Sequence, residues 1–293
     1  MRPHPLDPHP EVRLEPLSPR VTVAYGPLTG ERWQANATIV LGDRATAVVD
    51  AMMTPAQTAP VRAEAERLAA GRPVRWVLLT HADPDHVLGR STFEGAAVVG
   101  SERSAAVLRD ADVRESYAGI AARLGGDPDH FAMPAVDVAF REVLTVDLGG
   151  VTLEATSVAP GHSASDTLWW CPEERVAWSG DQLFHGAFPL VRTHLDGWFA
   201  GLERLAAYRP AVIVPGHGPV ATPAVLDDQR RLLEALADEV GGLLRAGATV
   251  EEAVARVELA DYRGLPMAGE RLAPAVRGVA VALGLVAEAD ASG

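Results

Sequence analysis

The sequence has one cysteine, no long apolar run and no cluster of basic residues. Cys171, standing alone, can form neither an internal disulfide nor a cysteine-ligated structural zinc site. With 39 acidic against 26 basic residues and a net charge of −13, the chain offers no cationic stripe for a phosphate backbone, so we expect no nucleic-acid partner. No apolar stretch could span a bilayer, and the first residues lack the pattern of a secretory signal. We therefore expect a cytoplasmic protein with no membrane partner.

The length and composition suit one large globular domain or a domain with an appendage. Of the 293 residues, 48% are hydrophobic and 22% are charged. A chain of this size can bury a substantial core. A disordered, collagen-like or coiled-coil protein is therefore excluded.

Strand and helix patterns alternate along the chain. Runs of strand-forming residues predict an antiparallel meander over 21–25, 36–41 and 45–49, followed by strands at 74–79 and near 97–99. Further runs predict a second sheet over 143–158, 167–171 and 175–178, and a strand at 211–214. Capping residues and helix-forming composition predict helices over about 54–71, 198–208, 223–246 and 273–287. The order predicts two halves, each a sheet backed by helices, with further helical cover over residues 226–293.

Four side chains that commonly bind metals follow the strand at 74–79: His81, Asp83, Asp85 and His86. Carboxylates crowded in this way repel one another unless a cation neutralises them, so the segment predicts a metal site. A structural interpretation is the alternative: Asp83 would begin a turn, Asp85 would cap a helix, and the histidines would face solvent.

Three more candidate ligands, His162, Asp181 and His217, lie at the ends of other strand patterns. Each has a glycine next to it, which lets the backbone approach an ion closely. The ordered set resembles the metallo-β-lactamase fold superfamily, whose His-x-His-x-Asp-His signature is followed by a lone histidine, an aspartate and a final histidine. The resemblance covers about residues 20–220.

This resemblance implies an α/β fold, a four-layer αββα sandwich of the metallo-β-lactamase type with a C-terminal helical extension. Residues 1–19 would be an N-terminal extension and residues 20–225 the metallo-β-lactamase-like domain. Residues 226–293 would then be a helical region packed on that domain. The sequence does not determine the oligomeric state.

The resemblance also implies two divalent metal ions. His81 and His162 would hold the first metal, and the second metal would be held by Asp85, His86 and His217. Asp181 would bridge both metals, and Asp85 would also be the catalytic residue. We expect zinc, with iron or manganese as alternatives, because carboxylate oxygens suit those metals as well.

One position departs from the common signature. Asp83 stands where the second histidine is expected, so an oxygen donor replaces a nitrogen donor at the first site. Three alternatives stay open: Asp83 binds the metal directly, binds through water, or leaves the first site weak. The extra negative charge would also make the first metal a weaker Lewis acid.

The implied function is hydrolysis of a small ester-like bond, a thioester or a lactone, by a metal-bound hydroxide. The substrate would be a small molecule or a carrier-bound acyl group. A polyketide-type thioesterase or cyclase, a non-haem iron redox protein and a non-enzymatic binding module are the alternatives. His185 and His194 follow Asp181 and are candidate substrate contacts, and arginines such as Arg192 and Arg263 would have to line the pocket for polyanionic substrates to bind.

Overall fold

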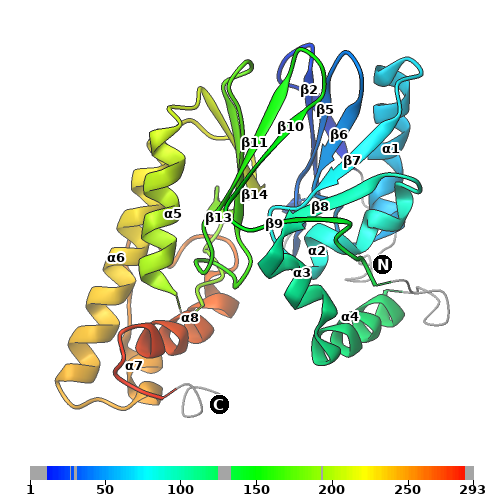
Figure 1. The fold of residues 1–293 in the computed structure, drawn as a ribbon. Coiled ribbons are helices and arrows are strands. Elements are labelled where there is room, and N and C mark those ends of the chain that lie inside the picture. Colours follow the sequence, from blue (N-terminus) through cyan, green and yellow to red (C-terminus); the bar gives the residue numbers. More distant parts are fainter. Residues whose placement is uncertain (1–11, 27, 30–31, 125–132, 193, 288–293) are drawn as a thin grey trace.

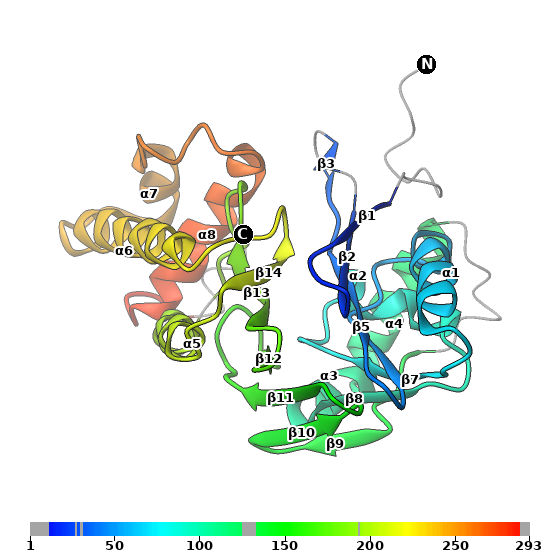
Figure 2. The ribbon, with the colours of Figure 1, turned by 90° about the horizontal axis from the view of Figure 1, so that it is seen from above.

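The computed structural model describes residues 12–26, 28–29, 32–124, 133–192 and 194–287. Two β-sheets face each other, and helices cover the outer face of each sheet (Figures 1 and 2). Viewed from above, the layers run from α1 and α4 through the two sheets to α5 and α6 (Figure 2). The expected four-layer αββα sandwich is confirmed.

The first sheet has seven strands in the order β1-β2-β5-β6-β7-β8-β9. Their bounds are Arg13–Pro16, Val21–Tyr25, Ala37–Leu41, Thr46–Val49, Val74–Leu78, Ala97–Ser101 and Val138–Phe140. Strands β1 to β6 pair antiparallel, as the predicted meander requires, whereas β6 to β9 pair parallel. A short hairpin of β3 (Leu28–Thr29) and β4 (Arg32–Trp33) stands apart from this sheet. Because β1 pairs with β2, residues 13–16 belong to the sheet; the predicted domain boundaries otherwise stay predictions.

The second sheet has five strands in the order β10-β11-β12-β13-β14. Their bounds are Val143–Asp147, Thr152–Ser157, Thr167–Cys171, Val176–Phe184 and Val212–His217. The last two strands are longer than predicted, because β13 continues beyond Trp178 and β14 includes Pro215 to His217. Irregular parallel pairing of β13 with β14, shifted in register around Gly180, lets both strands extend to the site. The prediction that Asp181 ends a strand is therefore wrong, since it lies within β13.

The helices are α1 (Pro55–Ala69), α2 (Pro84–Val87), α3 (Glu102–Arg109), α4 (Ala111–Arg123), α5 (Leu195–Ala207), α6 (Ala224–Arg245), α7 (Val250–Arg256) and α8 (Ala268–Ala282), and a 3-10 turn spans Leu88–Thr92. Thr54 and Gln57 form a capping box at the start of α1, where capping residues predict a helix. Helix α8 begins five residues before the predicted start, so Pro274, a residue type favoured in the first turn, lies inside the helix. Among the described residues, no helix combines the length and apolar character needed to cross a membrane.

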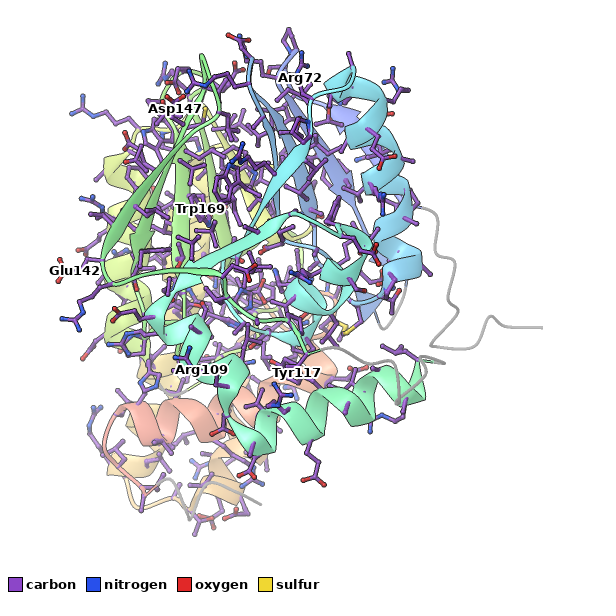
Figure 3. The ribbon with its side chains drawn as sticks, turned by 45° about the vertical axis from the view of Figure 1, so that its right-hand side comes forward. Arg72, Arg109, Tyr117, Glu142, Asp147 and Trp169 are labelled. Atoms are coloured by element: carbon purple, nitrogen blue, oxygen red, sulfur yellow. The ribbon has the colours of Figure 1, made fainter. Side chains whose placement is uncertain are left out.

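Alternating side chains build the core on both faces of the sheets. In β12, Trp169 and Cys171 point between the two sheets, whereas Leu168 and Trp170 pack toward the helices on the outer face. Figure 3 labels Trp169 in this central layer. Because side chains on both faces of the strands are buried, the strand sequences are continuous apolar runs. The strand tryptophans Trp169, Trp170 and Trp178 are all buried, so they pack in the core.

Candidate metal centre

The four residues of the first motif lie on the segment that leaves β7 and enters α2. Pro84 occupies the first turn of α2, where its missing N–H costs no hydrogen bond. Asp83 stands at the N-cap, yet its side chain makes no capping hydrogen bond. His81 and His86 are completely buried, with 0% of their surface exposed. The structural alternative with solvent-facing histidines is therefore wrong.

The other three predicted ligands come from the second sheet. His162 lies in the loop between β11 and β12, Asp181 lies within β13, and His217 is the last residue of β14. Two glycines make room for Asp181. Gly180 has a φ of +50°, and any Cβ on Gly216 would collide with Oδ1 of Asp181. Glycine is thus required here for a close approach of two strands, whereas the predicted close approach of the backbone to an ion stays a prediction.

The first group of donor atoms comes from His81, Asp83 and His162. The Oδ2 atom of Asp83 lies 3.6 Å from Nε2 of His81 and 3.6 Å from Nε2 of His162. Ligands held about 2.1 Å from one ion lie roughly 3 to 4 Å from each other. These separations therefore suit donors that share an ion.

A second group comes from Asp85, His86 and His217. Nε2 of His217 lies 3.2 Å from Oδ2 of Asp85. Asp181 lies between the two groups: its Oδ2 atom is 3.3 Å from His217 Nε2 and its Oδ1 atom is 3.3 Å from His86 Nε2. The same Oδ2 atom is 3.5 Å from Nε2 of His162 in the first group. This central position suits the predicted bridge, and the individual ligand roles stay predictions.

Several donor atoms of this cluster lack hydrogen-bond partners. Within the described part of the chain, five buried side-chain atoms of the cluster residues accept or donate no hydrogen bond: Nε2 of His81, His86 and His162, Oδ1 of Asp181, and Nδ1 of His217. Buried polar atoms are normally satisfied, so several orphaned atoms that converge require an explanation. Imidazole nitrogens and carboxylate oxygens are good ligands for zinc and other divalent transition metals. The residues present therefore fit a metal centre.

Asp50, at the end of β6, supports the cluster and was not predicted. Its Oδ2 atom accepts hydrogen bonds from Nδ1 of His86 at 2.8 Å and from the hydroxyl of Thr80 at 2.7 Å. The backbone N–H of Thr80 donates to the other oxygen at 2.9 Å. A carboxylate behind a ligating histidine fixes the ring and its tautomer. The signal in the sequence for this role was that Asp50 directly follows the predicted strand at 45–49.

The remaining histidines of the cluster are also held from behind. Nδ1 of His162 lies 3.1 Å from the carbonyl oxygen of Leu190, and Nδ1 of His81 lies 3.0 Å from the hydroxyl of Thr80. The ring of His217 instead stacks on Phe184, with centroids 5.3 Å apart. Each Nε2 atom is thereby directed into the cluster, as preorganised ligation requires.

Two further polar groups border Asp83. Arg192 places Nη2 2.5 Å from Oδ2 of Asp83, so one of the two arginines considered for polyanionic substrates lies at the site. Arg263 is exposed in the turn before α8, and the expectation for it stays a prediction. The hydroxyl of Tyr117, on α4, donates to the carbonyl of Ala82 at 2.7 Å (Figure 3). Burial and the charges of the nearby carboxylates raise the pKa of Tyr117, so it stays a neutral donor.

Among the described residues, His185 and His194 belong to neither group of donor atoms, nor to the set of His81, His86 and Asp181 that links the two groups. Nδ1 of His185 lies 2.9 Å from the carbonyl oxygen of Pro219. His194 is exposed at the N-cap of α5 and makes no side-chain cap. Their predicted contact with substrate stays a prediction.

Metal binding should release protons from this cluster. Burial disfavours the charged form of His217, but the carboxylates of Asp181 and Asp85 outweigh burial and raise its pKa to about 9. The ring is therefore protonated at neutral pH in the metal-free protein, whereas a ligating histidine must be neutral. At about pH 7 we expect at least about one proton released per chain.

Calorimetric zinc titrations in buffers of different ionisation enthalpy would count these protons. Proton release from His217 should fade as the pH rises through 9, because the metal-free ring is then already neutral. A binding enthalpy that is the same in every buffer at neutral pH would contradict this expectation.

Comparison with known proteins agrees with the geometry. The family model described as the Metallo-beta-lactamase superfamily matches residues 30–217. The chain is 30% identical over 191 residues to a hydroxyacylglutathione hydrolase from Methylobacterium sp. (strain 4-46), covering 64% of this chain and 65% of that protein. It is 25% identical over 259 residues to a linear primary-alkylsulfatase from Pseudomonas sp. (strain ATCC 19151), covering 73% of this chain and 48% of that protein. The chain thus spans about half of the alkylsulfatase and slightly under two thirds of the hydrolase.

Solved structures show the same fold. A metallo-beta-lactamase family protein from Thermus thermophilus superposes with a TM-score of 0.67 at 23% identity, covering 92% of this chain and 93% of that one. The match extends over most of the chain, including C-terminal helices beyond the family model. Because the family model covers well over half of the sequence and includes all seven predicted ligands, the chain belongs to the metallo-beta-lactamase superfamily.

Proposed function

We propose that this metal-dependent hydrolase of the metallo-beta-lactamase superfamily cleaves a thioester or a lactone. The observation that carries the proposal is the convergence of orphaned histidine and aspartate atoms in one buried cluster. The similarity to a hydroxyacylglutathione hydrolase supports an acyl thioester as the substrate class. Carrier-bound acyl groups belong to the same chemical class.

The protein's own residues would position the reactants. Divalent metal ions bound to the cluster would supply Lewis acidity for the attacking water and for the developing oxyanion. Asp85 has 22% of its side chain exposed, against 6% for Asp181, so its carboxylate can hold and orient a water that arrives from solvent. Phe184 and Trp198 border His162, with ring centroids at 5.6 and 5.4 Å, and exclude water from that side.

A sulfate ester is the second candidate because a half-buried arginine faces the cluster. Arg271 of α8 lies with its guanidinium carbon 5.2 Å from the centre of the Phe184 ring and donates to the carbonyl of Phe188 at 2.7 Å. Burial lowers its pKa, and the charges of Asp181 and Asp85 act against that change. A cation in this place could hold an anionic group of a substrate, and one relative is named as an alkylsulfatase.

A substrate panel tests the proposal. Purified protein loaded with zinc, iron or manganese would be assayed on acyl thioesters, lactones, alkyl sulfates, phosphodiesters and β-lactams, with His86→Ala as the control for contaminating activity. We expect thioester or lactone hydrolysis to dominate and to fall at least about a hundredfold in the control, because a direct ligand is lost. Faster turnover of alkyl sulfates would establish the second candidate instead. The proposal would be overturned by faster turnover of phosphodiesters or β-lactams, or by oxygen consumption without hydrolysis. Cyclised products from carrier-bound acyl chains would favour the cyclase alternative.

A further inference from the structure

The contact between Arg192 and Asp83 involves the oxygen that faces the metal-binding histidines. Nη2 of Arg192 lies 2.5 Å from Oδ2 of Asp83, and Nη1 lies 3.4 Å from Oδ1. That same Oδ2 atom is the one found 3.6 Å from both His81 and His162. The guanidinium therefore shares the oxygen that a metal at the first position would need.

This geometry differs from ordinary support of a carboxylate ligand. A partner that orients a ligand leaves the coordinating atom free and binds the other atoms of the group, as Asp50 does for His86 through Nδ1. Arg192 makes its short contact with the coordinating oxygen and its long contact with the remaining one. It also brings a full positive charge beside the place where a cation would bind.

The fold holds Arg192 in this position. Helix α8 packs against the backbone of the Arg192 segment at Gly278, where an added Cβ would lie 2.9 Å from the Arg192 carbonyl oxygen. On the other side, the carbonyl of Leu190 contacts Nδ1 of His162. Only 38% of the Arg192 side chain and 18% of the Asp83 side chain are exposed. The ion pair is therefore a partly buried contact of the site.

The second position carries no such cation. Among the described residues, the ion pairs of Asp85 are with His86 and His217, which are themselves candidate ligands. Burial lowers the pKa of Arg271 and the charge of Asp85 acts to raise it, but Arg271 makes no ion pair within the described part of the chain. The two positions thus differ by one contacting guanidinium.

We propose that Arg192 is a built-in counter-cation of the first metal position. It neutralises Asp83 and competes with a metal for the Oδ2 atom, so the second position fills first and the first fills only at higher metal concentration. Arg192 is in this sense a residue that sets metal occupancy. The inference holds whichever ester is the substrate.

Metal titrations of the full-length protein test this proposal without an activity assay. Metal-free wild type and Arg192→Gln would be titrated with Co²⁺ alone, followed by its visible absorption, and with Zn²⁺ in competition with a chelator. Wild type should show two separated binding steps. In Arg192→Gln the weaker step should tighten at least about tenfold, whereas the tighter step should change less than about threefold. A weaker step that is unchanged or loosened would overturn the proposal and make Arg192 an ordinary support of its ligand.

A double-mutant cycle shows whether the effect passes through Asp83. In an Asp83→Asn background, Arg192→Gln should give less than about a third of its gain in wild type, because the contested carboxylate oxygen is gone. The same gain in both backgrounds would overturn the mechanism.

Arg271→Gln is the matched control, because it removes a half-buried arginine near the cluster that does not contact Asp83. An equal gain in metal affinity for Arg271→Gln would mean that the effect comes from the loss of any nearby positive charge and not from the contact with Asp83. Thermal unfolding of each metal-free variant checks folding, and Arg192→Lys, which keeps the charge, should tighten the weaker step less than Arg192→Gln does.

Discussion

Replacing Asp181 with alanine should empty both metal positions and abolish hydrolysis. The Asp181 carboxylate lies 3.3 Å from His217, 3.3 Å from His86 and 3.5 Å from His162, so it touches donors of both groups. Loss of a residue that only supports a ligand already lowers metal affinity about 10- to 100-fold, so loss of a shared ligand should cost more than about a hundredfold at each position. Elemental analysis after gel filtration and chelator competition would measure both affinities.

The control for this variant is Asp147→Ala, because Asp147 also lies in the second sheet but is exposed and pairs with Arg44 (Figure 3). That variant should keep its metal and its activity. Unfolding of the metal-free proteins should show that Asp181→Ala still folds. Full occupancy at either position in a folded Asp181→Ala variant would contradict the bridging role, since that position would then not need the shared carboxylate.

The ligand set could be read from the sequence because metal ligation demands residue types in short, ordered patterns. His81 and His86 share one short segment after a strand, and His217 ends another strand beside a glycine. The two strands belong to different sheets, and the packing of the sheets face to face brings the segments at their ends together. The strand predictions and the resemblance therefore sufficed to place these side chains in one site.

The contacts behind the ligands could not be read in the same way. Asp50 lies 36 residues before His86, and Arg192 lies 109 residues after Asp83. Neither pair has a spacing that distinguishes it from other aspartates and arginines of an arginine-rich chain. Such pairs are set by sheet order and by the packing of α8, which sequence periodicity does not specify.

Local signals also failed where tertiary pairing decides the ends of elements. Gly180 and Pro215 are typical of turns, so the sequence predicts that β13 and β14 stop before the site. In the structure these two residues face each other across a parallel pair with shifted register, and both strands continue. The shift lets β13 carry Asp181 into the cluster, so the same irregularity that misleads sequence reasoning also positions a candidate ligand.

The replacement of Asp83 by histidine should raise zinc affinity at the first position, and the gain should depend on Arg192. Histidine would restore the nitrogen donor of the common signature between His81 and His162, and it would remove one negative charge. In the single variant, however, Arg192 loses its partner 2.5 Å away and its uncompensated charge repels the metal. We therefore expect a gain of only a few fold for Asp83→His and at least about tenfold for Asp83→His with Arg192→Gln, both measured by chelator competition. Equal or lower zinc affinity in the folded double variant would show that the aspartate is not what weakens the first position.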